Sequence, residues 1–131
     1  MLAVAALSAR ALVEAAALDG LRTVALDLFG DVDTRRAAAA WHRIGDTASL
    51  RIDAEQLLTA LDGLARSGEV RGWIAGSGFD GRADLLAQGA VRLPLIGTTA
   101  QDVRRVRDPQ TFFELLRSHG IGHPATAFEP P

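Results

Sequence analysis

The chain has 131 residues, 48% of them hydrophobic, with a net charge of −2 and neither cysteine nor lysine. Its length and apolar content suit one domain with its own core, and its charge gives no electrostatic footprint for a nucleic acid or an anionic membrane. The missing residue types exclude disulfides, thiolate nucleophiles, cysteine metal sites, Schiff-base lysines and lysine phosphate clamps within this chain.

The first half of the chain alternates apolar strands with helical patterns. Residues 2–7 predict a buried strand, and the charges of Arg10 and Glu14 soon interrupt this apolar run, which argues against a signal sequence or a membrane span. A helix over 9–19 ends at Gly20, and a second strand follows over 22–28. A short helix over 34–40 and a short third strand over 41–44 come next.

We expect a cytoplasmic protein.

The second half continues the alternation. Asp53 predicts the N-cap of a helix that runs to about residue 66, residues 72–75 form a strand, and a helix starts at about residue 82 and runs to 88. Residues 93–97 are a last short strand, Thr98 or Thr99 caps another helical turn, and Pro109 opens a helix that Gly120 ends. This order predicts an α/β class, three-layer Rossmann-like fold with a mostly parallel sheet of 4–5 strands.

The loops after the strands of a parallel sheet meet at one edge, where ligands of such folds bind. Four polar or glycine-rich loops fall there, at residues 8–10, 27–35, 76–80 and 97–98. Their convergence predicts a binding crevice at this edge.

The second of these loops is acidic. Asp27 ends the second strand, where related folds place a ribose-binding acid, although a structural role is an equal alternative. Asp31 and Asp33 follow, and either can simply cap the next helix. This pair could bridge a divalent ion, but no further ligand is identified, so we predict no metal site.

The loop Gly76-Ser77-Gly78-Phe79-Asp80 is the best candidate for close approach of the backbone to a ligand. A tight turn that needs glycine geometry is the alternative. No lysine follows, so the loop is not a Walker motif, and the 6–10 loop lacks the glycines of a dinucleotide fingerprint. The three histidines show no metal-ligand spacing. The arginines at 104, 105 and 107 indicate a solvated helix face.

Together, the segments 8–10, 27–35, 76–80 and 107–124 resemble the amino-terminal part of ATP-grasp proteins, in particular those of a carboligase-like group. In that family a Rossmann-like pre-ATP-grasp domain comes first, and a helix ending in Gly-Ile-Pro-x-Pro leads into the ATP-binding domains. Here the sequence reads Gly120-Ile121-Gly122-His123-Pro124, so the match is approximate.

The resemblance implies a pre-ATP-grasp domain over residues 1–106 and a helix and linker over 107–131 that lead toward an ATP-grasp domain. The full enzyme would use ATP and magnesium, at sites outside this segment, to activate a carboxylate as an acyl phosphate and transfer it to an amine or a similar nucleophile. We therefore expect an excised first domain or a truncated product of a larger ligase, inactive alone and binding none of these cofactors.

The resemblance also implies that the loops form one wall of the substrate site, with Arg10 as the first candidate to pair with a substrate carboxylate. The predicted substrate-binding residues are Ser8, Arg10, Asp27, Phe29, Asp31, Asp33, Arg35, Gly76, Ser77, Gly78 and Phe79. No catalytic residue is predicted.

Two alternatives remain. A stand-alone small-molecule or nucleotide-binding module would use the same four loops without catalysis. A receiver-type signalling domain shares the fold class, but Ala6-Leu7 stands where that fold needs paired acids, and its lysine is missing. A ligase fragment should expose an apolar patch for the next domain, with Phe79 or Phe128 as candidates, and such a patch could also form a homodimer.

Overall fold

The computed structural model describes residues 1–127, in which four parallel strands form the central sheet. The strands are β1 (Leu2–Ala5), β2 (Thr23–Asp27), β3 (Ala40–Arg43) and β6 (Trp73–Ala75), in the spatial order β3-β2-β1-β6. β1 pairs with both β2 and β6, so the strand order changes direction beside β1. All four carboxyl ends therefore lie at one edge, which confirms the predicted fold class.

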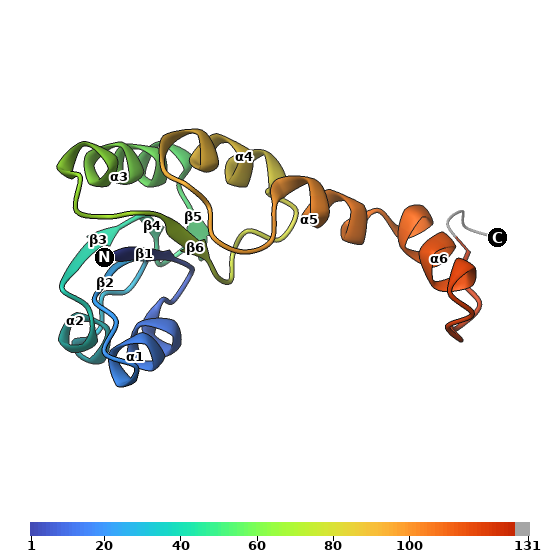
Figure 1. Ribbon diagram of the computed structural model, residues 1–131, viewed down its shortest axis with the longest axis horizontal. Coiled ribbons are helices and arrows are strands. Elements are labelled where there is room, and N and C mark those ends of the chain that lie inside the picture. The colour runs from blue at the N-terminus through green and yellow to red at the C-terminus, as the bar shows by residue number, and fades with distance from the viewer. Residues whose placement is uncertain (128–131) are drawn as a thin grey trace.

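Helices cover both faces of the sheet (Figure 1). Helices α1 (Arg10–Leu18) and α2 (Val32–Ala37) lie together on one face, and α3 (Ala54–Ser67) and α4 (Ala83–Arg92) lie together on the other. A small antiparallel hairpin of β4 (Gly45–Asp46) and β5 (Arg51–Ile52) stands between β3 and α3. The result is the expected three-layer arrangement.

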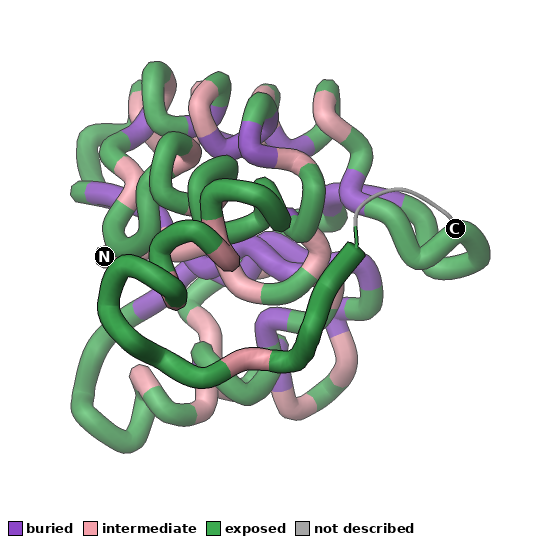
Figure 2. Tube along the Cα trace, turned by 90° about the vertical axis from the view of Figure 1, so that its right-hand side faces the viewer, coloured by how far each residue is buried: buried purple, intermediate pink, exposed green. Residues whose placement is uncertain are grey.

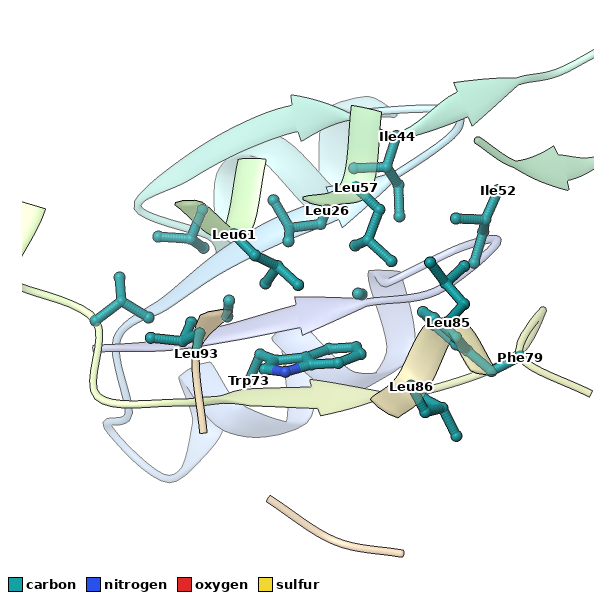
Figure 3. Close-up of a cluster of buried hydrophobic side chains, with 14 of the residues drawn as sticks. Leu26, Ile44, Ile52, Leu57, Leu61, Trp73, Phe79, Leu85, Leu86 and Leu93 are labelled. Carbon is teal, nitrogen blue, oxygen red and sulfur yellow. The ribbon is translucent and has the colours of Figure 1, made fainter. Parts of the chain in front are cut away.

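The larger core lies between the sheet and the pair α3 and α4 (Figure 3). Trp73 is fully buried there, and the α4 backbone at Gly89 approaches its ring so closely that an added Cβ would lie 2.6 Å from Trp73 Cζ2. Leu57 and Leu61 of α3 are also fully buried. Their spacing of four residues puts both on one face of the helix, which gives α3 its buried side.

The opposite face has a smaller core made of short side chains. Val4, Ala9, Val13 and Ala25 form it, with Trp41 packed at its margin. Alanine and valine let α1 lie close to the sheet, which it contacts through its one buried residue, Val13.

The structure differs from the sequence analysis at three places. Residues 93–97 do not form a strand: Leu95 makes a single parallel bridge to Trp73, because Pro94 offers no amide hydrogen and Gly97 turns the chain away. The hairpin of β4 and β5 was not predicted. α2 begins at Val32 rather than at Thr34, with Asp31 as its N-cap.

The last two helices, α5 (Ala100–Arg107) and α6 (Pro109–Ser118), extend away from this body as an arm (Figure 1). Thr99 caps α5 and Asp108 caps α6, and Pro109 takes the first helical position as predicted. Neither helix has a buried residue. In Figure 2, where the arm faces the viewer, it is drawn almost wholly as exposed or intermediate chain, in contrast to the buried sheet behind it.

Candidate functional site at the carboxyl edge of the sheet

Backbone hydrogen bonds hold the predicted loops together where the strands end. The amide of Leu7 donates to the Ser77 carbonyl at 2.9 Å, and the amide of Leu28 donates to the Leu7 carbonyl at 3.3 Å. The loop after β1 thus contacts both the loop after β2 and the loop after β6. The sequence correctly predicted that these segments converge, because a parallel sheet leaves them no other edge.

Asp27 is the centre of one half of this edge. It is completely buried, and its Oδ1 accepts hydrogen bonds from the amides of Phe29 and Gly30 and from Trp41 Nε1, at 3.1, 2.9 and 2.7 Å. Its Oδ2 accepts from the amide of Ala9 at 3.0 Å. This carboxylate therefore ties β2 to β3 and also faces the amino end of α1, where a negative charge is favoured. These contacts make Asp27 a structural anchor of the edge.

Arg10 lies in the first turn of α1, beside the acidic loop. Its Nη2 is 2.7 Å from Asp33 Oδ2, and its Nε is 3.1 Å from Glu14 Oε1. The hydrogen bond with Glu14 and the charge of Asp33 raise the pKa of the Arg10 guanidinium. All three side chains are partly exposed, so this cluster stays accessible to a ligand. A ligand carboxylate would have to compete with Asp33 for the Arg10 guanidinium.

Arg35 of α2 lies flat against a tryptophan. Its Cζ is 4.2 Å from the centre of the Trp41 ring, and its Nε donates to the Gly30 carbonyl at 2.6 Å. Gly30 has a positive φ of 53°, and a Cβ there would meet the same ring at 2.4 Å. Glycine is required at this turn because the indole fills the space that a side chain would need.

The remaining residues of the acidic loop are more exposed. Asp31 accepts a hydrogen bond from the amide of Thr34 at 2.8 Å, which lowers its pKa. The side chain of Phe29 is 43% exposed, and Ser8 is exposed in the turn before α1. The structure thus brings Ser8, Arg10, Phe29, Asp31, Asp33 and Arg35 to one side of the edge, around the buried Asp27.

The glycine loop after β6 packs against the protein itself. A Cβ on Gly76 would lie 2.9 Å from the Ala6 Cβ, and one on Gly78, which has a φ of 97°, would lie 2.7 Å from the Leu7 Cγ. Glycine is needed at both positions because this loop packs tightly against the loop after β1. This matches the alternative stated above, a tight turn that needs glycine geometry. Ser77 between them is exposed.

Phe79 is a core residue, which corrects the expectation that it belongs to an exposed docking patch. It is only 4% exposed, and its ring lies 5.6 Å from that of Trp73. The other candidate for that patch, Phe128, lies outside the described residues.

An open cleft of about 770 Å³ lies beside the glycine loop. Its walls are the hairpin of β4 and β5, the start of α3 and the loop that enters α4. The lining includes Asp46, Ser49, Leu50, Arg51, Ile52, Asp53, Ala54, Gly78, Asp80 and Arg82. Gly78 was the only one of these among the predicted site residues. The turn-forming sequence Gly45-Asp46-Thr47 between two apolar segments was the signal that could have indicated the hairpin and its cleft.

Within residues 1–127, no group of three His, Asp or Glu side chains is close enough to hold a metal ion. The search of the same residues for a helix of the length and apolarity needed to cross a membrane was negative.

Several solved structures share this fold. A biotin carboxylase domain of a single-chain bacterial carboxylase superimposes with a TM-score of 0.68 and 18% identity, over 92% of this chain and 29% of that one. A single-chain, multi-domain long-chain acyl-CoA carboxylase superimposes with a TM-score of 0.71 and 16% identity, over 98% of this chain and 14% of that one. A complete multifunctional pyruvate carboxylase from Rhizobium etli superimposes with a TM-score of 0.64 and 21% identity, over 92% of this chain and 12% of that one. No family profile and no curated protein matches the sequence.

These likenesses establish the fold: the chain has the Rossmann-like α/β fold found within biotin carboxylase structures. The chain spans less than a third of the length of each of the structures described above. At identities of 16 to 21%, the likeness carries the fold and not the activity.

Proposed function

We propose that this chain is the substrate-side domain of a larger ATP-grasp ligase. The observation that carries the proposal is the coverage of the structural matches: nearly all of this chain superimposes on a small part of a multi-domain carboxylase. In those proteins the fold is one part of a longer chain. Residues 1–106 would form the substrate-side domain, and residues 107–131 would lead toward an ATP-grasp domain.

In this proposal the full protein binds ATP and magnesium outside the present segment and activates a carboxylate as an acyl phosphate. An amine or a similar nucleophile then takes the acyl group, and phosphate leaves. The segment supplies one wall of the substrate site and no catalytic residue. The exposed or partly exposed residues that support this role are Ser8, Arg10, Phe29, Asp31, Asp33, Arg35 and Ser77.

The charged groups at the edge suggest how a substrate would be oriented. Arg10 can exchange Asp33 for a substrate carboxylate, because both side chains are partly exposed and the guanidinium can donate paired N–H bonds to the carboxylate that replaces Asp33. Asp27 acts through the backbone amides that it holds. It is a positioning residue, since it has no exposed surface to touch a ligand.

The test is the size and activity of the protein in its source cells. An antibody raised against this segment should detect a band far above 13.9 kDa on an immunoblot. The purified long form should then convert ATP to ADP with magnesium and a carboxylate, and hydroxylamine should trap the acyl phosphate as a hydroxamate. Arg10→Gln should raise KM for the carboxylate more than it lowers kcat, whereas Arg36→Gln, on the exposed side of α2, should change neither.

A band at 13.9 kDa alone would overturn the ligase proposal and leave a free-standing binding module of the same fold. A long form that neither consumes ATP nor yields a hydroxamate with any of a panel of carboxylates would also overturn it.

A further inference from the structure

We propose that the cleft between the β4–β5 hairpin and the loop entering α4 binds a small organic acid, whose carboxylate is held by Arg51 and Arg82 and whose apolar body lies against Leu50. The proposal concerns this chain alone and requires no ATP-grasp domain. It therefore goes beyond the proposed ligase role and can fail separately from it.

Two arginines of the cleft have N–H groups without a hydrogen-bond partner in the part of the chain that the structure describes. Arg82 Nη1 donates to the Ile52 carbonyl at 3.1 Å, which fixes this partly buried guanidinium across the floor of the cleft. Its Nε and Nη2 have no partner within residues 1–127. Arg51 is exposed, and its guanidinium likewise lacks a partner among the described residues. Two cations on the walls of one cleft thus have donors to spare.

The acids of the cleft do not use these donors. Asp46 accepts from the amides of Ala48 and Ser49, at 3.1 Å each, and Asp53 accepts from the amide of Gln56 at 2.8 Å. The amides of Ala48 and Ser49 lower the pKa of Asp46.

The third acid, Asp80, is 3.0 Å from Arg107 Nη1. Each carboxylate on the cleft wall is therefore paired with a donor other than Arg51 or Arg82. The surplus is of donors, which is the chemistry that recognises an anion.

The three acids also limit the charge of the ligand. Because Arg107 pairs with Asp80, Asp46 and Asp53 are left to balance Arg51 and Arg82, so the cleft has no strongly positive field and is poorly suited to a multiply charged phosphate. A single carboxylate, which two guanidinium groups can hold by charge-assisted hydrogen bonds, fits this balance.

The apolar part of the cleft supports an organic ligand rather than a bare ion. Leu50, at the tip of the hairpin, has a φ of 50°, the only positive φ of a non-glycine residue within the described part of the chain. Its side chain is 56% exposed on the wall of the cleft, near the buried Ile52. A ligand that covers Leu50 would remove this exposed apolar surface from water. The cleft volume of about 770 Å³ lies in the range of small-molecule sites.

The test is an NMR titration of the ¹⁵N-labelled 131-residue protein with phenylacetate, and separately with the uncharged phenylacetamide and with inorganic phosphate. Phenylacetate should shift the amide signals of Ser49, Ala54 and Gly78 with saturation, at a Kd on the order of 1 mM. Phenylacetamide should bind at least about tenfold more weakly, because the charge-assisted hydrogen bonds are lost. Phosphate should also bind more weakly.

Matched variants assign the site. Arg51→Gln and Arg82→Gln should each raise the Kd about tenfold. Arg71→Gln, which removes an exposed arginine before β6 at the opposite edge of the sheet, should leave it unchanged. If Arg82→Gln disturbs the fold through its lost bond to Ile52, Arg51→Gln decides alone, because the exposed Arg51 side chain makes no hydrogen bond or ion pair within residues 1–127.

Three results would overturn the proposal: no saturable shifts at the cleft up to the solubility of phenylacetate, equal binding of acid and amide, or an Arg71→Gln effect as large as that of Arg51→Gln. Tighter binding of phosphate than of phenylacetate would overturn the organic-acid assignment and indicate a bare anion site. None of these results bears on ATP use by a longer form, so the failure of this proposal and that of the ligase role are distinguishable.

Discussion

The body and the arm of this molecule contain helices of similar length that are stabilised in different ways. In the body, α4 (Ala83–Arg92) buries four residues against the sheet, whereas α6 (Pro109–Ser118), also 10 residues long, buries none. Both helices have an apolar side. The difference shows that an amphipathic sequence gives a helix an apolar side but does not determine whether another part of the protein buries that side.

The contrast extends to the loops. The carboxyl edge of the body is fixed by buried groups, above all Asp27. The arm is held by exposed N-caps at Thr99 and Asp108, by contacts of α5 with α4 and with α6, and by the exposed ion pair of Arg107 with Asp80. The apolar side of the arm stays in water, with Val106 60% and Leu115 46% exposed. The following changes test whether stability resides in the body, in order of expected size.

The largest effect is expected from Asp27→Ala. The substitution leaves the amides of Ala9 and Gly30 and the Trp41 indole N–H without their acceptor in a buried setting. At 1–3 kcal/mol for each unsatisfied group, the free energy of unfolding should fall by about 4 kcal/mol or more, as measured by urea denaturation.

The matched control for that change is Asp33→Ala, which removes a carboxylate from the same loop whose side chain is 42% exposed. An exposed ion pair contributes about 0–1 kcal/mol, so little should change. Equal losses from the two variants would show that Asp27 does not anchor the edge.

The next prediction compares the loss of stability on truncating a leucine of the body with that on truncating a leucine of the arm. Leu61→Ala empties a fully buried position under Trp73 and should lower the free energy of unfolding by about 3 kcal/mol. Leu115→Ala, on α6, should change it by less than about 0.5 kcal/mol, because this side chain is already in water. A large loss from Leu115→Ala would mean that something covers the arm in solution, and analytical ultracentrifugation at several concentrations would show whether a second copy does so.

A smaller effect separates two glycines of the body. Gly78→Ala forces a Cβ against Leu7 at a φ of 97° and should cost about 2 kcal/mol in thermal or urea unfolding. Gly63→Ala, in the middle of α3 with nothing within 4 Å of the added Cβ, should instead stabilise by about 0.5–1 kcal/mol. Opposite signs are the expected result. A neutral Gly78→Ala would show that the loop is not packed as tightly as the structure has it.

The sequence predicted most of the body, because alternation of short apolar strands with capped helices specifies a parallel sheet and the edge at which its loops meet. It also predicted the cap at Asp53 and a cap at Thr98 or Thr99, of which the structure has Thr99, because a cap is a local interaction. It could not predict that Asp27 is enclosed, because the indole that covers it comes from Trp41 on another strand. The cleft was missed because β4 and β5 have only two residues each, too few for any periodicity.

The smallest effect concerns pH, and it distinguishes the cap of the body from that of the arm. The amide of Thr34 lowers the pKa of Asp31, and the hydroxyl and amide of Thr111 lower the pKa of Asp108, both from a usual value of 3.8. Because the folded pKa is the lower one, each cap contributes its full stabilisation above about pH 3.8 and loses it as the pH falls through the folded value. Carboxyl ¹³C titration should show both midpoints below 3.8.

Thr111→Val separates the two caps, because it removes the hydroxyl that is the main cause of the Asp108 shift and leaves α2 untouched. The pKa of Asp108 should rise toward its usual value while that of Asp31 stays lowered. The α6 amides alone should then lose helical shifts at a higher pH than in the parent protein. If the signals of α3 and α4 changed over the same pH range, the arm and the body would unfold as one unit, and the independence inferred from the unburied helices of the arm would be wrong.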